Sequence, residues 1–349
     1  MDDKLSYHES LTLQNFTAFT DVTLDFVHGI NVFIGENGTG KTHLMKAMYA
    51  WQMSRHLADL NGHINYGQMF SDTFGARSAG ELQRSNRRVA VAKGKIGAND
   101  WSIGIRGDVV TFGGHSPKPN RPVFIPAIEM MAHARNMAGV LRDYADFDRT
   151  CFDFVNMVTA KRQNDRDPRY SLEMDELEGL IPGQVDWNED QQRFYLTQKG
   201  VTLAFPLLAE GLRKVSSLDR LVKLNWIRRG GVLFWDEPEV NLNPKWMDEV
   251  VEALVHLARQ KVQIFLATHN YVILKEIDLV LRKQNKGDDA DVQARFFSLH
   301  KLREATKVTW NEDFAAVPNA ILDQYDIMLN EDLRLQDSNL RRTENGAHQ

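Results

Sequence analysis

The residues best suited to chemistry lie in one glycine-rich stretch near the start of the chain. Residues 35–42 read Gly-Glu-Asn-Gly-Thr-Gly-Lys-Thr and match the pattern G-x-x-x-x-G-K-[ST] in full. Glycines let such a loop curl until successive backbone N–H groups point at one anion, and a following helix N-terminus adds partial positive charge. We therefore predict a phosphate-binding loop made of Gly35, Glu36, Asn37, Gly38, Thr39, Gly40, Lys41, Thr42 and His43.

Two side chains of this loop have distinct expected tasks. Lys41 is predicted to bridge the β- and γ-phosphates of a nucleotide, and Thr42 to hold Mg²⁺ through its hydroxyl. The alternative is a glycine-rich turn that matches the pattern by chance. However, a β-rich run precedes the loop at 30–34 and helical spacing follows it at 43–51, which is the context that the motif requires. ATP and Mg²⁺ are therefore the expected cofactors.

A second candidate cluster follows a continuous apolar run at residues 231–235. The run ends in Asp236 and Glu237, as expected for a buried parallel strand with its polar tip at the carboxyl edge of a sheet. Asp236 is the predicted magnesium acid, and Glu237 the predicted general base that deprotonates the attacking water. An apolar strand that ends in acids is common by itself, so this interpretation depends on the phosphate loop.

A third buried run, 262–267, leads directly to His269. This histidine follows Glu237 by 32 residues, which leaves room for one helix, at 244–259, and a return strand. His269 is thus predicted to lie at the same sheet edge as Glu237, where a neutral imidazole senses the γ-phosphate. The alternative is a structural histidine at the end of a strand.

The intervening segments predict the elements that position these residues. Alternating apolar residues predict two strands joined by a short turn within 10–26, and short alternating runs separated by Gly and Asn predict an antiparallel meander within 83–112. Residues 113–122 are a turn-rich connector, and 130–174 are predicted to be mainly helical.

Taken together, the chain resembles ABC-type ATPases of the RecF/SMC/OLD-like branch, and more narrowly the small bacterial AAA family ATPases of phage-defence and abortive-infection cassettes. The resemblance covers nearly the whole chain. It rests on LTLQNFTAFTDVTLDF, INVFIGENGTGKT, VFIPAIEMM, AEGLRK, VLFWDEPEVNLNP and FLATHN. It implies an α/β P-loop NTPase fold, an ABC-type ATPase head with an antiparallel β-subdomain and a helical lobe.

The resemblance also implies a head-to-tail dimer in which a signature loop contacts the nucleotide of the opposite copy. Residues 208–212 align with the usual LSGGQ and keep Gly211, but Ala209 replaces the phosphate-contacting serine. Either Arg213 or Lys214 then supplies the trans contact, or closure is weaker and hydrolysis slow. A solvated helix face is the alternative for both basic residues.

The loop between the two lobes departs from the family pattern too. Related ATPases place a glutamine there, and residues 123–129 offer none. Glu129 is a substitute candidate, although a carboxylate that caps the helix predicted from Met130 is the simpler interpretation. Asn241 and Asn243 resemble the loop that communicates across the dimer.

We expect a single ATPase domain over 1–330 with three parts. These are lobe I with the β-subdomain (1–115), the helical lobe with the signature-like loop (116–225) and the core with Glu237 and His269 (226–330); 331–349 are expected to be a flexible tail. Sustained heptads and a CxxC motif are absent from the sequence, so no coiled-coil arm or zinc hook is expected.

Composition narrows the function classes. The formal charge is −5, so no global basic field indicates a nucleic-acid partner, although short basic clusters at 84–88, 161–162 and 228–229 leave one open. The single cysteine excludes an internal disulfide and a multi-cysteine zinc site. No apolar run approaches the roughly 20 residues of a membrane span, so we expect a cytoplasmic protein without a membrane partner.

The leading hypothesis is an ATP-dependent dimeric or larger homo-oligomeric switch that regulates or scaffolds a separate effector protein, a nuclease or toxin, in anti-phage defence. The effector is implied by the family resemblance alone. The alternatives are a RecF-like DNA repair protein, the nucleotide-binding subunit of a transporter and a non-hydrolysing scaffold.

Overall fold

The computed structural model describes most of the chain. The described residues are 5–114, 120–135, 147–161, 170–173, 179–284, 292–303, 305–318, 327–328, 330–331 and 333–335. Much of the helix expected from Met130 onward and nearly all of the expected tail therefore lie outside the described residues.

A six-stranded sheet forms the centre of a mixed α/β fold. Its order is β14-β13-β3-β12-β11-β7, and every neighbouring pair is parallel except β13 and β14. The strands are β3 (Ile30–Gly35), β7 (Val123–Ile125), β11 (Val232–Asp236), β12 (Gln263–Thr268), β13 (Ala294–Leu302) and β14 (Ala305–Asn311). The strands predicted at 30–34, 231–236 and 262–267 are thereby found.

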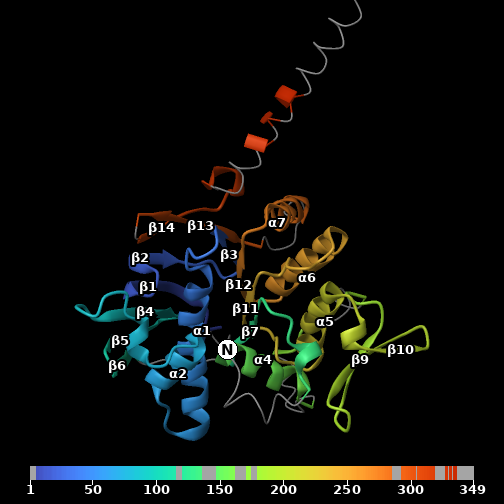
Figure 1. Cartoon of the computed structure of the whole chain (residues 1–349), viewed down its shortest axis with the longest axis horizontal. Coiled ribbons are helices and arrows are strands. Elements are labelled where there is room, and N and C mark those ends of the chain that lie inside the picture. Colours follow the sequence, from blue (N-terminus) through green and yellow to red (C-terminus); the bar gives the residue numbers. More distant parts are fainter. Residues whose placement is uncertain are drawn as a thin grey trace, which may run out of the picture.

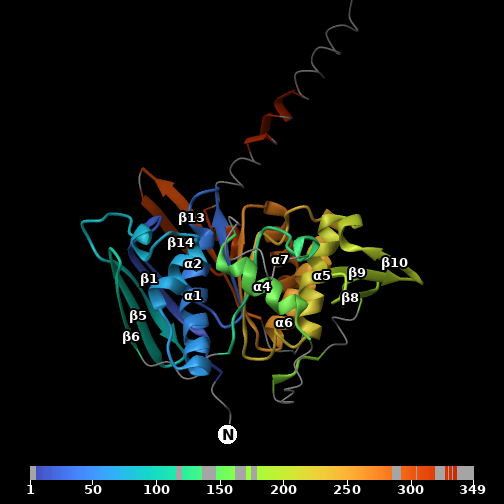
Figure 2. The same ribbon diagram turned by 60° about the horizontal axis from the view of Figure 1, so that its bottom comes forward.

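Helices cover both faces of this sheet. The helices are α1 (Lys41–Asn61), α2 (Tyr66–Phe74), α4 (Arg149–Thr159), α5 (Glu210–Lys223), α6 (Met247–Arg259) and α7 (Tyr271–Gln284). Single 3-10 turns are η1 (Ala79–Leu82), η2 (Met131–His133), η4 (Phe205–Leu207), η5 (Pro244–Trp246) and η6 (Phe314–Ala316). Figures 1 and 2 show α1 on one side of the central sheet and α5, α6 and α7 on the other.

Alternation along the central strands separates two hydrophobic cores. Trp235 and Leu266 face the core shared with α4, α5, α6 and α7, whereas Phe234 and Phe265 face the core shared with α1. The rings of Phe234 and Phe265 stack with centroids 5.1 Å apart. Burial on both faces explains why these strands are continuous apolar runs in the sequence.

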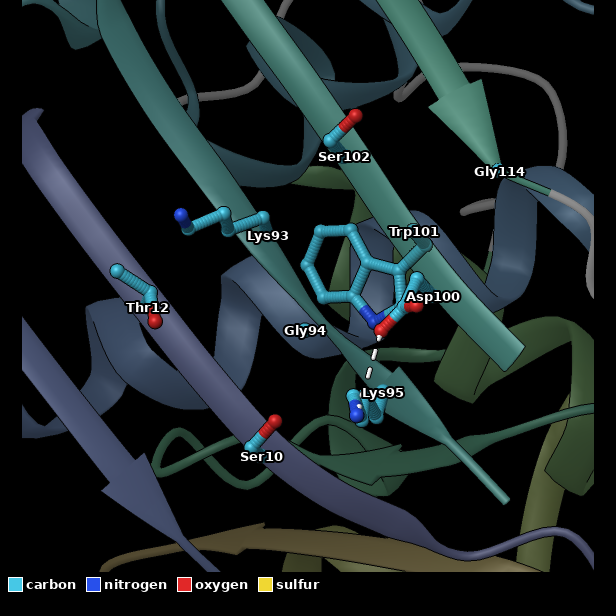
Figure 3. Close-up of a pocket in the computed structure, with 9 residues that line it drawn as sticks. All are labelled: Ser10, Thr12, Lys93, Gly94, Lys95, Asp100, Trp101, Ser102 and Gly114. Carbon is cyan, nitrogen blue, oxygen red and sulfur yellow. Dashed lines mark ion pairs between the residues drawn. The ribbon is translucent and has the colours of Figure 1, made fainter. Parts of the chain in front are cut away.

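A five-stranded antiparallel sheet packs against α1, in the order β2-β1-β4-β5-β6. Its strands are β1 (His8–Phe16), β2 (Phe19–Asp25), β4 (Ala90–Ile96), β5 (Asn99–Arg106) and β6 (Val109–Gly114), which agrees with the predicted strand pair and meander. An open cavity of about 380 Å³ lies on this sheet and is lined in part by Lys93, Lys95 and Ser102. Figure 3 shows these side chains on the strands that carry them. None of the residues that line the cavity belongs to the nucleotide motifs.

Two features of the expected helical lobe, 116–225, differ from expectation. A three-stranded antiparallel sheet lies within it, formed by β8 (Gln184–Asn188), β9 (Arg193–Gln198) and β10 (Val201–Ala204). Its strands are short and β10 is almost wholly exposed, so hydrophobic alternation gave little signal. Strand β7 pairs with β11 and thus belongs to the central sheet.

The longest helix that the structure describes, α1, has 21 residues and contributes many of them to the core instead of projecting as an arm. Across the described part of the chain, no helix combines the length and apolarity that a bilayer crossing requires.

A buried polar network joins the two sheets to α1. His8 is fully buried and its Nε2 lies 2.8 Å from Gln52 Oε1 on α1. Gln263 on β12 accepts a hydrogen bond from the His8 backbone N–H and donates one to the His8 carbonyl, each at 2.8 Å. Because buried polar groups must be satisfied, this pairing fixes how β1 docks on the central sheet.

This network predicts acid sensitivity. Burial lowers the pKa of His8 to about 4, from an ordinary 6.5. Between pH 6.5 and pH 4 the unfolded chain therefore binds a proton at His8 that the native state does not bind. Protonation of His8 in the unfolded chain alone lowers the free energy of unfolding by up to about 3 kcal/mol over this range. Urea unfolding at a series of pH values should show a shallower loss in His8→Gln than in the wild type.

The exposed His63 provides the control, because His63→Gln removes an imidazole that the fold does not bury and should keep the wild-type slope. Equal slopes in the wild type and His8→Gln would contradict the assignment of this acid sensitivity to His8.

Candidate nucleotide-binding site

Three neighbouring parallel strands bring the predicted site residues together. In the register of the central sheet, Ile34 on β3 pairs with Thr268 on β12, and Ala267 pairs with Asp236 on β11. The three strands therefore end at one edge, where the phosphate loop, the acidic turn and the His269 turn follow. A carboxyl edge of this kind is where ligands bind in open α/β sheets.

The glycine-rich loop has the curled backbone that the motif predicts. Gly40, directly before α1, has a φ of +96°, and a Cβ at this position would lie 2.8 Å from Phe19 Cζ. Any other residue would meet both a strained backbone and the β1–β2 turn. Behind the loop, Thr306 on β14 donates a hydrogen bond to the Thr39 carbonyl at 3.0 Å.

Lys41 is folded back over this loop. Its Nζ donates to the carbonyl oxygens of Gly35 at 2.7 Å and Glu36 at 3.0 Å. Burial lowers the pKa of Lys41, while the charges of Glu237, Asp236 and Glu239 act in the opposite direction. A buried amine beside the N-terminus of a long helix provides the charge and the donors that a polyphosphate requires, so the loop fits a nucleotide.

Thr42 and Asp236 meet across the strand ends. The Thr42 hydroxyl donates to Asp236 Oδ2 at 2.8 Å. Burial raises the pKa of Asp236 to about 6, which shows that this carboxylate lies where its charge is poorly solvated. Mg²⁺ prefers such hard oxygen ligands and takes only one or two from the protein when phosphates supply others. The pair therefore fits the predicted magnesium position.

Glu237 and His269 form a direct pair at the same edge. His269 Nδ1 lies 3.0 Å from Glu237 Oε1, and both side chains retain access to solvent, with 41% and 25% of their areas exposed. An accessible carboxylate oriented by an imidazole is suited to accept a proton from water. The structure thus brings together Lys41, Thr42, Asp236, Glu237 and His269; their chemical roles remain predictions.

The sequence analysis missed Glu239, which lies deeper at this edge. Its carboxylate is 2% exposed and Oε1 accepts hydrogen bonds from the Thr268 hydroxyl and, at 3.4 Å, from the His269 backbone N–H. Glu239 therefore anchors the turn that carries His269. A third acid two residues after Glu237 was the available signal, but the sequence does not show which carboxylate is buried.

The phosphate-loop residue His43 packs against Phe74 of α2. Its ring lies 5.5 Å from the ring of Phe74. Burial lowers its pKa to about 4, so the imidazole is neutral at physiological pH.

The signature-like loop lies at the start of α5. Gly211 packs so closely on the segment after Glu237 that a Cβ there would lie 2.7 Å from the Asn241 carbonyl oxygen. Ala209 precedes the helix, and its side chain makes no capping hydrogen bond. Packing within one chain therefore explains why position 211 requires a glycine. The expected contact of Gly211 with a nucleotide in the opposite copy remains a prediction.

The two basic candidates for a trans contact are engaged within the chain. Arg213 Nε pairs with Glu129 Oε2 at 2.8 Å, and the Lys214 side chain is buried and donates to the carbonyl oxygens of Glu237 and Ala127. Only 2% of Lys214 is exposed, so the interpretation of a solvated helix face is wrong for it, and a contact with a second copy stays a prediction.

Glu129 acts as a capping carboxylate in this structure, which was the simpler of its two interpretations. Its Oε1 accepts hydrogen bonds from the backbone N–H groups of Met131, at 2.6 Å, and Ala132, at 3.2 Å. It therefore caps the 3-10 turn η2. Glu129, Arg213 and Glu237 also line a cavity of about 310 Å³ between the β7 exit, α5 and the acidic turn.

Two family models match parts of the chain. A model described as "AAA domain, putative AbiEii toxin, Type IV TA system" matches residues 122–275, which include Asp236, Glu237 and His269. A second AAA-domain model matches residues 10–69, which include the phosphate loop.

Curated relatives carry the name DNA replication and repair protein RecF. The protein from Oenococcus oeni is 41% identical over 68 residues, which is 19% of this chain and 18% of the relative. The protein from Pasteurella multocida is 29% identical over 96 residues, 28% of this chain and 23% of the relative. The matched parts thus span about a fifth of the length of these relatives.

Solved structures share the fold over a much larger part. An Smc head bound to the C-terminal winged-helix domain of ScpA has a TM-score of 0.56 at 10% identity, over 89% of this chain and 99% of that chain. An Smc head with an extended coiled coil, from Pyrococcus furiosus, has a TM-score of 0.53 at 10% identity, over 93% and 99%. The AAA-domain matches and the RecF-named relatives support an ABC-type ATPase of the RecF/SMC branch, and the Smc heads share the fold of this chain.

Proposed function

We propose that this chain is an ATP-driven switch that binds Mg²⁺ and ATP between two copies and resets by hydrolysis. The observation that carries the proposal is the meeting of Lys41, the Thr42–Asp236 pair and the Glu237–His269 pair at one sheet edge. Phosphoryl transfer to water requires a phosphate donor set, a metal site and a base, and this edge offers each. The matches to two AAA-domain models support the same reaction.

The chain's own groups divide the work as follows. Bound ATP with Mg²⁺ supplies a polarised γ-phosphate. Lys41 exchanges the carbonyl oxygens of Gly35 and Glu36 for phosphate oxygens, and Thr42 and Asp236 hold the metal. Glu237 accepts the proton of the attacking water, while His269 keeps its carboxylate in place.

The dimer is the conformational part of the proposal. Family resemblance implies that the start of α5 contacts the nucleotide of the second copy. Ala209 offers no hydroxyl there, but the first N–H groups of a helix are ready donors for a phosphate. Arg213 is held by the Glu129 carboxylate and by the carbonyl oxygens of Phe205 and Leu208, so a move toward the second copy would break these contacts. Turnover is therefore expected to be slow or stimulated by a partner.

We propose a separate effector protein, a nuclease or toxin in bacterial anti-phage defence, as the target of the switch. The match to the AbiEii-type AAA model supports this assignment. RecF-named relatives support a second candidate, an ATP-dependent DNA-binding repair protein. The two candidates share the nucleotide site and differ in what ATP binding controls.

Replacement of Glu237 should separate binding from hydrolysis. Glu237→Gln removes the base but keeps the size of the side chain, so kcat should fall about 100-fold or more while ATP binding persists. Light scattering after size exclusion should then find the variant with ATP and Mg²⁺ at twice the mass of one chain.

The exposed Glu252 on α6 gives a matched control, and Glu252→Gln should hydrolyse ATP like the wild type. Lys41→Ala should not bind ATP or change mass. Full hydrolysis by Glu237→Gln would exclude Glu237 as the base.

Salt dependence distinguishes the two candidate functions. A RecF-like protein should bind a gapped DNA duplex more tightly with ATP, with a log–log salt slope of about −0.9 for each phosphate contact. Arg87 and Arg88 are exposed, so their joint replacement by Gln should reduce that slope by about two units in a DNA-binding protein. For an effector switch, we expect fluorescence anisotropy to detect no gain in DNA affinity with ATP.

A further inference from the structure

The buried Lys214 has an unusual environment for an amine. Only 2% of the residue is exposed, and its Nζ donates hydrogen bonds to the carbonyl oxygens of Glu237 and Ala127. Burying a charged group costs several kcal/mol unless it is paired or hydrogen-bonded. Hydrogen bonds to two backbone carbonyl oxygens offset part of that cost. Because the two oxygens belong to different segments, the amine also joins these segments.

One of these segments is the peptide of the proposed base. Glu237 has a φ of +46°, in the left-handed region that non-glycine residues adopt only when their surroundings impose it. Its backbone N–H donates to the Ala267 carbonyl at 2.9 Å and its side chain pairs with His269, both of which hold it from the β12 side. Lys214 holds the carbonyl of the same residue from α5.

The charges around Lys214 favour this position. Glu239, Glu237, Asp236 and Glu210 act to raise its pKa, whereas burial lowers it to about 8, so the amine keeps its proton at neutral pH. Glu129 lies on the neighbouring loop and pairs with Arg213. The ammonium ion thus lies at the acidic strand edge and points its donors at carbonyl oxygens.

Helix α5 is attached to the acidic turn at a second point. Gly211, one helical turn before Lys214, allows the helix backbone to touch the carbonyl of Asn241. Two contacts in the first turns of α5 therefore span the segment from Glu237 to Asn241. A displacement of the start of α5 moves this segment, because packed backbones and a buried hydrogen bond do not stretch freely.

We propose that Lys214 is a positioning residue for Glu237: its ammonium group clamps the left-handed Glu237 peptide to the β7 exit loop and to α5, so that the geometry of the base follows the position of α5. This inference rests on the proposed hydrolytic function. It assigns to Lys214 a task within its own chain in place of a contact with the opposite copy.

A purely structural buried lysine is the competing explanation. Loss of such a residue would lower stability and disturb binding and turnover together. A positioning residue instead changes kcat and leaves the affinity for ATP almost unchanged, because Lys41 and the phosphate loop do not contact it through any hydrogen bond described here.

The experiment compares steady-state kinetics with ATP and Mg²⁺ for the wild type, Lys214→Met, Lys214→Gln and Lys214→Arg. Met keeps the apolar stem without donors, and Gln is too short to reach both carbonyl oxygens. We expect kcat to fall about 30-fold or more in both, with KM for ATP within about threefold of the wild type. The kcat of Lys214→Arg should be at least about tenfold higher than that of Lys214→Met, because Arg restores a cationic donor.

Lys95, on the five-stranded sheet beside the cavity of Figure 3, provides the control because it is exposed and outside the nucleotide motifs. Lys95→Met should keep the wild-type kcat and KM. Thermal unfolding of each variant identifies any that fail to fold, and if Lys214→Met fails, Lys214→Gln decides by the same criteria.

The outcomes separate this inference from the proposed function. A wild type without turnover overturns both. Wild-type turnover with an unchanged kcat in the Lys214 variants, an increase in KM in step with the loss of kcat, or no recovery in Lys214→Arg overturns the inference alone.

Discussion

The hydrogen-bond ladder that joins β3, β12 and β11 is the constraint on which the rest of the site depends. Parallel strands in register end together, so the segments after Gly35, Asp236 and Thr268 emerge at one edge although they are far apart in the sequence. The register in turn depends on burial, because a slip of one residue would exchange the two apolar faces. Trp235 and Phe234 belong to different cores and fix that choice.

Charge at this edge sets the second requirement. Asp236 and Glu239 are buried and their pKa values are raised, while Lys41 and Lys214 are buried beside them with lowered values. Each group is costly to bury alone, and the opposing charges and hydrogen bonds reduce the cost. A site of this kind favours ligands that bring both a cation and an anion, as a magnesium nucleotide does. Among Asp236, Glu237 and Glu239, the side chain of Glu237 is the most exposed to solvent.

Neighbouring elements contact the site closely from two sides. Gly211 permits backbone contact between α5 and the Asn241 segment, and the Arg213–Glu129 pair connects the same helix to the loop after β7. On the other side, Thr306 supports the phosphate loop from β14. The strand edge is therefore contacted by β14 on one side and by α5 on the other, and α5 lies closer to the proposed base than to the phosphate loop in this set of contacts.

The amino-acid sequence by itself determined the phosphate loop, the strand before it, the acidic turn at Asp236 and Glu237 and the strand before His269. These are local patterns: glycine spacing, a lysine, and apolar runs that end in polar residues. The placement of His269 at the same sheet edge as Glu237 also followed, since one helix and one return strand fit between them, whereas the contact of the two side chains came from the structure. The sheet formed by β8, β9 and β10 did not follow from the sequence, because a strand of four to six residues offers too few apolar positions to establish a period.

Only the tertiary structure decided which charged groups are buried and what they contact. Glu239, Thr306 and Lys214 have ordinary sequence surroundings, and their partners lie 29, 267 and 23 residues away. Arg213 and Lys214 are adjacent and similar in sequence, yet one pairs with a carboxylate and the other with backbone carbonyl oxygens. Local propensity acts over one helical turn or strand, whereas burial and charge compensation depend on segments that only folding brings into contact.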